Sequence, residues 1–579
     1  MPAISSTHRL AISGLAALWF GFSAPAASDE RPFDPSPFGP AVSAALKERD
    51  EQDATQGNRI AIIRNGYDAL LLRVHLIRHA RHAIAVQTFI WTNDECGRLV
   101  AHELLNAARR GVKVRVIVDH MFSDHDPDTV AFLATAHPNF ELKHYRPAMS
   151  RIKPSVLHTL LASLRSFRQL NQRMHNKVMI FDGTILLTGG RNIENTYFDH
   201  STTLNFLDRD VLAVGAVAAK AVESFEEFWR YRHAVPSRNL ADVGAAIARN
   251  TFHRYPTRAN YGFGPHFITL EQQADDAALI ASHFVARLKP VRKATFVSDA
   301  PGKPGGASDG RRTTSEVRAI LARAKLSVVM QTPYLVLSAP LRDAFRDLQE
   351  ANPGLRIAIS TNSLASTDNF LAYSANYRLR RHYVEDLKLL VHEFKPRPGS
   401  LSTLFPRHAL MARFAQEQAG ASEDAVPFLS LHAKSLVVDD HIAFVGSHNL
   451  DPRSDNMNTE AGLVVEDESF AQALRTEIEH DMAPENSWVI ARRTLPPGLD
   501  ELNQVVDGIF SLIPINLWPV STTSSFELRP GATPLPSDHP LFEENYRNVG
   551  ALPGNSSLSQ KRILTHISKT FAAPMTPML

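Results

Sequence analysis

The stretch RMHNKVMIFDGTILLTGGRNI at residues 173–193 decides the fold, because its pattern returns as SLHAKSLVVDDHIAFVGSHNL at residues 430–450. Each copy has a His-x-Lys, two short apolar runs around an acidic turn, and a glycine-containing turn that ends in asparagine. The asparagine follows the histidine by 17 residues in both copies, from 175 to 192 and from 432 to 449. A single His-x-Lys carries little information, but the same elements in register twice indicate an internal duplication.

The sequence around the two copies also repeats. Strands are expected at residues 83–91, 112–118, 178–181, 185–187 and 211–214, with helices at 97–110 and 217–230. The same order returns as strands at 327–332, 355–360, 436–438, 442–445 and 462–465, with helices at 341–350 and 470–482. Strands that alternate with helices predict an α/β fold. We expect two similar halves with mostly parallel central sheets, related by a pseudo-two-fold axis, and an active site at their interface.

The chain has 579 residues, of which 44% are hydrophobic and 21% charged, so it can bury a sizeable core. The net charge of +2 comes from 62 basic and 60 acidic residues, and this balance argues against a general nucleic-acid binder. Its one cysteine, Cys96, cannot form an internal disulfide or a cysteine-rich metal site. The predicted organisation is a signal peptide at 1–28, a tether at 29–56, half 1 at 57–236, a connecting segment at 237–290, half 2 at 291–490 and a C-terminal extension at 491–579.

The first 28 residues have the pattern of an export signal. Residues 10–22 are apolar and uncharged, and Ala24-Pro25-Ala26 supplies a small-x-small cleavage pattern. An uncleaved anchor or a buried N-terminal helix would fit the same apolar run. On the export-signal interpretation, we expect an exported protein that is periplasmic or membrane-associated if its source is bacterial.

The duplicated side chains predict phosphodiester chemistry. Residues i and i+2 of an extended strand share a face, so each histidine is presented together with its lysine. These groups and the two asparagines would converge if the halves met; the set is His175, Lys177, Asn192, His432, Lys434 and Asn449. Lysines and asparagines can stabilise charge on phosphoryl oxygens, while one imidazole attacks phosphorus and the other transfers the proton. We expect two displacements through a phosphohistidine, with neither a metal nor an organic cofactor.

The duplicated His-Lys-Asp-Gly-Asn pattern resembles the phospholipase D superfamily over residues 57–485. The stretches at 87–91, 173–177, 189–193, 362–365, 377–378 and 449–454 look most like bacterial cardiolipin synthases. This resemblance implies that His175 is the nucleophile and His432 the acid/base.

The same resemblance implies supporting acidic residues. Asp182 and Asp439 would support the scaffold, and an acidic residue after each motif would orient the histidine of the partner motif. Glu460 fits this role, and its expected counterpart is Asp208, although Asp210 is close enough to serve instead.

Three segments are candidates for contact with lipid. A basic amphipathic helix at 156–167 fits an anionic membrane surface or, equally, packing on the core. The apolar patch at 509–518 has the same two interpretations. Arg173, Tyr373, Tyr377 and Arg378 are candidate headgroup-binding residues, although the last three would also fit an exposed helix face.

The expected function is phosphatidyl transfer at a membrane surface, with phospholipid substrates and no nucleic-acid partner. Phosphatidylglycerol as acceptor would give cardiolipin, whereas water would give phosphatidic acid as in a phospholipase D hydrolase. A phosphodiesterase or nuclease would use the same motifs, and a catalytically silent membrane scaffold is the candidate from a different functional class. The presence of every chemical group in both copies argues against the scaffold. The sequence does not predict an oligomeric state.

Overall fold

The computed structural model describes residues 35–51, 57–121, 123, 126–147, 150–154, 171–303, 310–418, 426–493 and 522–554. The expected signal peptide, the basic helix at 156–167 and the apolar patch at 509–518 lie outside these residues. Within the described part of the chain, no helix is both long enough and apolar enough to cross a bilayer.

The first half is built on a nine-stranded sheet with the order β10-β1-β8-β6-β5-β2-β3-β4-β9. Its strands are β1 (Asn58–Ile63), β2 (Ala83–Thr88), β3 (Lys113–Asp119), β4 (Phe140–Tyr145), β5 (Val178–Phe181), β6 (Ile185–Gly189), β8 (Asp210–Gly215), β9 (Ala234–Pro236) and β10 (Lys289–Val291). Its helices include α3 (Gly66–His79), α4 (Glu95–Arg109), α5 (Pro127–Thr135) and α7 (Val217–Arg230).

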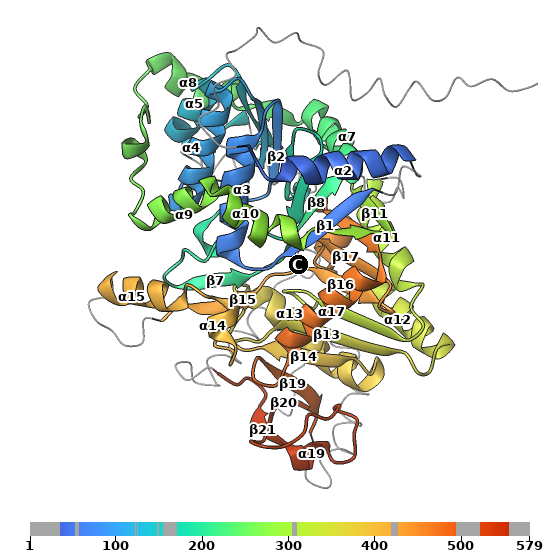
Figure 1. The fold of residues 1–579 in the computed structure, drawn as a ribbon. Coiled ribbons are helices and arrows are strands. Elements are labelled where there is room, and N and C mark those ends of the chain that lie inside the picture. Colours follow the sequence, from blue (N-terminus) through green and yellow to red (C-terminus); the bar gives the residue numbers. More distant parts are fainter. Residues whose placement is uncertain are drawn as a thin grey trace, which may run out of the picture.

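The second half repeats this order in a ten-stranded sheet, β11-β18-β17-β16-β12-β13-β14-β19-β20-β21. Its strands are β11 (Lys293–Ser298), β12 (Ser327–Gln331), β13 (Arg356–Asn362), β14 (Leu390–Phe394), β16 (Ser435–Val438), β17 (Ile442–Gly446), β18 (Ala461–Glu466), β19 (Ser487–Arg492), β20 (Thr523–Leu528) and β21 (Tyr546–Gly550). Its helices include α11 (Arg312–Leu321), α12 (Ala339–Ala351), α13 (Phe370–Arg381) and α17 (Glu468–Met482). Strands β1 to β9 and β11 to β19 follow the same order, which confirms the prediction of two similar α/β halves (Figure 1).

The prediction that the central sheets are mostly parallel is wrong. Only the pairs β2–β3, β3–β4, β12–β13 and β13–β14 are parallel within the two large sheets. The strands on either side of Asp182 and of Asp439 are joined by tight turns, and a tight turn can connect only antiparallel neighbours. A parallel pair needs a long crossover, which α4 and α12 provide between the first two parallel strands of each half.

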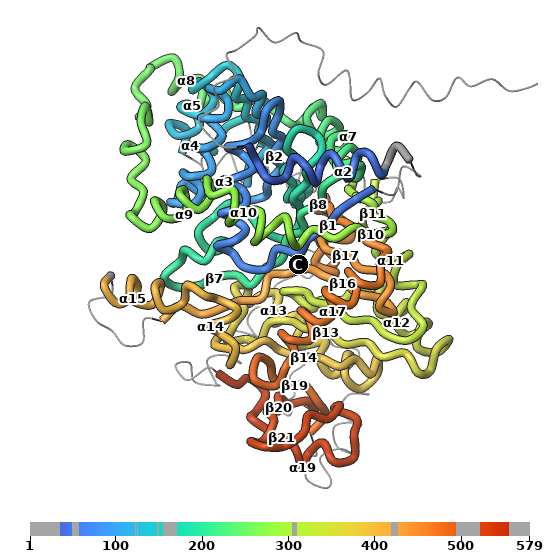
Figure 2. Tube along the Cα trace, in the orientation of Figure 1, coloured from blue at the N-terminus to red at the C-terminus, as the bar shows by residue number. Residues whose placement is uncertain are grey.

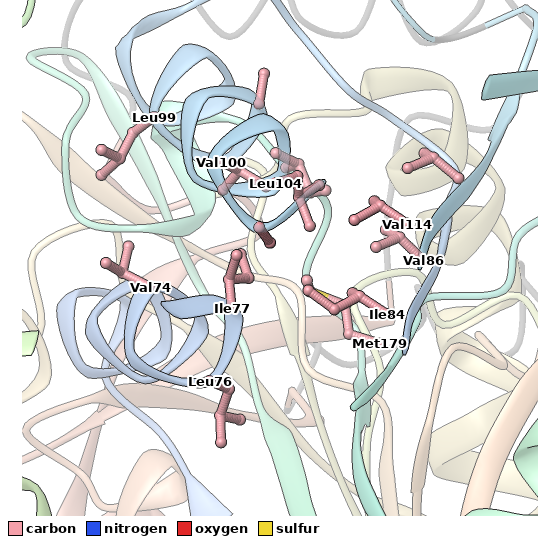
Figure 3. Packing of buried hydrophobic residues seen from close by; sticks show 14 of the residues in the cluster. Val74, Leu76, Ile77, Ile84, Val86, Leu99, Val100, Leu104, Val114 and Met179 are labelled. Atoms are coloured by element: carbon pink, nitrogen blue, oxygen red, sulfur yellow. The ribbon is translucent and has the colours of Figure 1, made fainter. Parts of the chain in front are cut away.

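Helices α3 and α4 cover one face of the first sheet. Figure 3 shows Ile77 of α3 and Leu104 of α4 lying toward Ile84, Val86 and Val114 of the sheet. Each of these side chains is fully buried. Burial of a side chain of this size contributes roughly 1.5–3 kcal/mol relative to exposure.

The two halves share a second core and a small sheet. Phe225 of α7 belongs to the same buried cluster as Val437, Leu463 and Leu474 of the second half. Strand β7 (Leu204–Leu207) of the first half pairs in parallel with β15 (Phe428–Leu431) of the second. The two strands lie side by side at the boundary between the halves in both ribbon and tube (Figures 1 and 2). The pairing aligns the residue after β7, Asp208, with the residue after β15, His432.

Three segments outside the predicted repeat also have regular structure. Helix α2 (Phe38–Glu51) lies within the segment expected to be a tether, and its Phe38 and Ala45 are buried seven residues apart on one helix face. The connecting segment forms α8 (Ala241–Arg249), α9 (His266–Asp275) and α10 (Ala277–His283). Strands β20 and β21 of the C-terminal extension continue the second sheet.

Candidate active site

The first His-x-Lys is held in an extended conformation between the two halves. Met174 N donates to Asp119 Oδ2 at 2.9 Å, which ties the motif to the carboxyl end of β3. His175 N donates to Thr459 O at 2.9 Å, and Thr459 N donates back to Arg173 O at 2.9 Å. This pairing places His175 beside Glu460 of the second half.

The second motif is held in a corresponding way. Leu431 N donates to Asn362 Oδ1 at 2.8 Å, at the carboxyl end of β13. His432 N and Ala433 N both donate to Leu207 O, at 2.8 and 3.1 Å. His432 therefore lies beside Asp208 of the first half.

Each imidazole is paired with a carboxylate from the opposite half. His175 Nδ1 donates to Glu460 Oε2 at 2.8 Å, and His432 Nδ1 donates to Asp208 Oδ2 at 2.6 Å. Asp210, the second residue considered as a partner of His432, instead accepts from Arg73 Nη2 at 2.8 Å. With Nδ1 bound to a carboxylate, Nε2 is the nitrogen of each ring that is left to meet a ligand.

Both imidazoles are held in the neutral form. Each histidine has only 5% of its surface exposed. Burial lowers the pKa of His175 to about 4, against the opposing effect of Glu460. Burial and Lys434 lower the pKa of His432 to about 4, against the opposing effect of Asp208. Burial alone would raise the pKa of Glu460, but His175 holds it at about 2, so this partner stays a carboxylate.

The two lysines bring cationic groups to the same place. Lys177 Nζ donates to His175 O at 2.9 Å. Lys434 Nζ donates to His432 O and lies 2.8 and 3.0 Å from Nδ1 and Nε2 of the same ring. Burial lowers the pKa of Lys434 to about 8. Burial also lowers the pKa of Lys177 well below its usual value, and the positive charge of Lys434 lowers it further. Lys434 therefore lies within electrostatic range of Lys177.

The two asparagines differ in their partners. Asn192 Nδ2 donates to Tyr197 Oη at 2.8 Å, and its Oδ1 accepts from Ile90 N at 3.1 Å. Asn449 is buried, and within the described residues its Oδ1 has no hydrogen-bond partner. A buried carboxamide oxygen without a partner is costly unless a ligand or water satisfies it.

The aspartates of the duplicated motif support the scaffold by their contacts. The carboxylate of Asp182 accepts three backbone N–H groups, from Arg81, His82 and Ala83, at 2.8 to 3.0 Å. Asp439 accepts the three corresponding groups ahead of and at the start of β12, each at 2.8 Å. Both aspartates thereby fasten the hairpin turn to the central strand of their own half.

Four further residues at the site were not predicted from the sequence. Phe89 packs edge-on against His175, with ring centroids 4.7 Å apart. Tyr197 Oη lies 3.4 Å from His432 Nε2. Ser447 Oγ and Ser454 Oγ donate to the two oxygens of Glu460. Both serines lie inside the motif stretches, but their partner Glu460 lies after them in the chain. The spacing of the motif therefore did not indicate the contact.

The four candidate headgroup residues lie in separate environments, and the structure does not gather them around the motif side chains. Arg173 is fully buried, with Nη1 3.4 Å from Asp119 Oδ1. Tyr373 Oη donates to Glu393 at 3.3 Å, and Tyr373 and Tyr377 belong to a small apolar cluster with Leu552. Arg378 is exposed on α13. Between Tyr373 or Tyr377 and the motif side chains, the described part of the chain shows no hydrogen bond.

The comparisons with known proteins agree with this architecture. Residues 74–229 and 317–482 match the family model described as "Cardiolipin synthase, PLD-like domain", where PLD denotes phospholipase D. The chain therefore belongs to the cardiolipin synthase family of phospholipase D-like proteins.

Individual relatives cover most of the chain. An uncharacterized protein of Helicobacter pylori is 32% identical over 81% of this chain and 87% of that protein. Cardiolipin synthase C of Escherichia coli strain K12 is 30% identical over 70% of this chain and 81% of that protein. A crystal structure of phosphatidylserine synthase from Haemophilus influenzae aligns with 81% of this chain and 97% of that chain, at 16% identity and a TM-score of 0.48.

Proposed function

We propose that this protein transfers a phosphatidyl group from one phospholipid to a hydroxyl group of another, and that cardiolipin is the product when the acceptor is phosphatidylglycerol. The crossed pairing of each imidazole with a carboxylate of the opposite half carries the proposal. This pairing equips one site with two oriented imidazoles and two ammonium groups, which suits displacement at a phosphodiester.

In the first displacement, His175 acts as the nucleophile. Its Nε2 lone pair forms a bond to phosphorus, and the bond from phosphorus to the headgroup oxygen breaks. Glu460 stabilises the positive charge that develops on the ring, because it accepts from Nδ1. Lys177 and Lys434 neutralise the non-bridging oxygens, and Asn192 and Asn449 supply amide N–H donors.

The leaving oxygen takes a proton from His432 Nε2. An imidazole with a pKa of about 4 is mostly neutral at pH 7, so it must gain a proton before this step. A bound phosphodiester brings a negative charge next to the ring and raises its pKa, which favours the protonated form in the substrate complex.

In the second displacement, neutral His432 Nε2 removes the proton of an incoming hydroxyl group. The hydroxyl oxygen forms the new bond to phosphorus, and the bond from phosphorus to His175 Nε2 breaks. His175 is then neutral again, and His432 is protonated as it was in the substrate complex before the first displacement. Water in place of the lipid hydroxyl gives phosphatidic acid by the same steps.

The experiment that tests the proposal supplies the purified full-length protein with labelled phosphatidylglycerol in mixed micelles, with and without phosphatidylethanolamine, and resolves the products. Labelled cardiolipin supports the proposal, and phosphatidic acid alone replaces it with a hydrolase. Cleavage of added DNA with intact lipid replaces it with a nuclease. His441→Ala, at an exposed histidine in the turn after β16, is the matched control for His432→Ala.

We also infer that the reaction takes place at a membrane surface after export, from the apolar and cleavage patterns within residues 1–28. Cell fractionation tests this inference with the full chain and with a variant that lacks residues 1–28. The full chain is expected in the exported or membrane fraction and the shortened chain in the cytosol. Equal distribution of the two would contradict it.

A further inference from the structure

The site has a first side, next to His175, and a second side, next to His432. Corresponding segments of the two halves place different side chains on these two sides. Strand β2 ends with Gln87-Thr88, and β12 ends at Gln331, which Thr332 follows. On the first side, Phe89 packs on His175, and Lys177 Nζ lies 5.1 Å from the centre of the Phe89 ring. On the second side, Tyr334 Oη donates to the Asp368 carboxylate, at 2.8 and 3.0 Å from its two oxygens.

The segments that carry Tyr334 and Asp368 are anchored directly to the second motif. Thr332 Oγ1 donates to Asn449 O at 2.6 Å, two residues before Tyr334. Asn362 donates to Leu431 O at 2.7 Å and accepts from Leu431 N at 2.8 Å, immediately before His432. Asp368 itself is exposed, so its carboxylate is accessible to a ligand. The negative charge of Asp368 also acts to raise the pKa of Lys434, which agrees with a position close to the site.

The first half has a pocket near the backbone of Phe89. It is lined mostly by hydrophobic residues, which include Trp91, Val118, Val130 and Phe132. Ser123, which also lines this pocket, donates to Phe89 O at 3.4 Å. Aromatic rings contact both imidazoles, Phe89 at His175 and Tyr197 and Phe206 at His432. The His432 side adds the Asp368 carboxylate and the phenol of Tyr334 that donates to it.

We propose that Asp368, held by Tyr334, binds the headgroup alcohol of the phospholipid through the hydrogen-bond donors that this alcohol carries beyond the phosphate. The proposal rests on the proposed function. A nucleophile and its leaving group lie on opposite sides of phosphorus in an in-line displacement. Attack by His175 therefore directs the departing alcohol toward His432, the side where Asp368 lies.

A carboxylate at this position selects by charge and by hydrogen bonding. It repels the phosphate, which the lysines bind, and it attracts an ammonium group or accepts from a hydroxyl group. Ethanolamine and glycerol headgroups both present such donors, whereas a methyl headgroup presents none. A site built to bind a donor discriminates against an analogue that lacks it.

The experiment compares Asp368→Asn with the wild-type protein on three phospholipids that share their acyl chains: phosphatidylethanolamine, phosphatidylglycerol and phosphatidylmethanol. Release of the headgroup alcohol is measured at matched lipid mole fraction. We expect kcat/KM to fall about fivefold for phosphatidylethanolamine, the factor that corresponds to loss of an ion pair of about 1 kcal/mol at an exposed position. A smaller fall is expected for phosphatidylglycerol, and no change for phosphatidylmethanol.

Tyr334→Phe removes the hydroxyl that holds the carboxylate, and it should reproduce the same order of effects more weakly. Asp347→Asn, at an exposed position on α12, is the matched control and should leave all three rates unchanged. An equal effect of Asp368→Asn on all three lipids, or no effect on any, would overturn the inference. Absence of turnover by the wild-type protein would instead overturn the proposed function.

Discussion

The two imidazole–carboxylate pairs have matching geometry but are anchored differently. Glu460 receives His175 and the hydroxyls of Ser447 and Ser454, so three side chains fix its carboxylate. Asp208 receives His432 and the backbone N–H of Arg209, at 2.6 and 2.7 Å. A glutamate side chain has one more rotatable bond than aspartate, and the two serine hydroxyls restrict that extra freedom.

The glycine-containing turns after β6 and β17 also contact the two carboxylates differently. Gly190 and Ser447 occupy matching positions in the two copies. A Cβ atom at Gly190 would lie 2.1 Å from Asp208 Oδ1, so the first turn leaves no room for a side chain. At the second turn, the side chain of Ser447 is one of the groups that hold Glu460. The duplication thus repeats the imidazole positions, while the support behind each imidazole is particular to its half.

The largest expected effect separates the two histidines. We expect His175→Ala and His432→Ala each to reduce turnover of natural phospholipids about ten thousandfold or more, as removal of a central catalytic group does in other enzymes. With a phosphatidyl ester of p-nitrophenol, whose leaving group needs no proton, His432→Ala should still accumulate an acid-labile phosphoenzyme. His175→Ala should form none, and its formation there would show that the nucleophile is misassigned.

The carboxylates come next in expected effect. Glu460→Gln and Asp208→Asn should each reduce turnover about a hundredfold, because an amide cannot stabilise the imidazolium as a carboxylate does. Single-turnover measurements with the natural lipid should show slower phosphoenzyme formation in Glu460→Gln. Asp208→Asn should slow proton transfer through His432, and its effect should shrink with the p-nitrophenyl ester. Equal effects of the ester on both variants would show that the two pairs do not have separate roles.

The pH dependence should show an alkaline decline from the second half. The pKa of Lys434 is lowered to about 8, so its positive charge is present below pH 8 and is lost as the pH rises through this value. Loss of the cation weakens binding of the phosphate, and we expect kcat/KM to fall about tenfold between about pH 8.5 and 9.5, the slope of a single deprotonation. Lys434→Arg, whose cation persists, should reduce this slope; a wild-type profile that stays flat to about pH 10 would contradict the assignment.

The smallest expected effect concerns the hydroxyl that distinguishes the two turns. Ser447→Ala removes one of the donors to Glu460 and should reduce turnover about fivefold, the equivalent of one hydrogen bond of about 1 kcal/mol. The effect should appear in phosphoenzyme formation. Ser282→Ala, at an exposed serine of α10, is the control. No change in Ser447→Ala would show that His175 and Ser454 suffice to hold the carboxylate.

Much of the repeated architecture was predictable because it is encoded locally. The apolar runs around Asp182 and Asp439 predicted the hairpins that the structure contains. The four helices predicted within the two repeats begin and end within two residues of the bounds of α4, α7, α12 and α17. The direction of strand pairing was not predicted correctly, because alternation of helices and strands does not determine whether neighbours are joined by a crossover or by a hairpin. Strands β4 and β14 were missed, since short mixed-polarity stretches such as residues 140–145 carry a weak periodic signal.

The candidate site divides in the same way. The duplicated spacing identified the histidines, lysines and asparagines, because these groups lie close together in the chain. Spacing could not distinguish Asp208 from Asp210 as the partner of His432. In the structure His432 contacts Asp208, whereas Asp210 accepts from Arg73. Phe89 lies in the stretch 87–91 that carries the family resemblance, but that stretch gave it no role, and Tyr197 lies outside the motif stretches.

The sequence by itself determined that this chain is a duplicated α/β protein with two matching sets of histidine, lysine and asparagine side chains, because these features depend on residue type and local periodicity. Only the tertiary structure decided that each imidazole takes its carboxylate from the other half, and that Tyr334 donates to Asp368. The physical reason is that these contacts join residues more than two hundred positions apart, or loops whose approach depends on how the two sheets pack, and neither leaves a trace in local sequence.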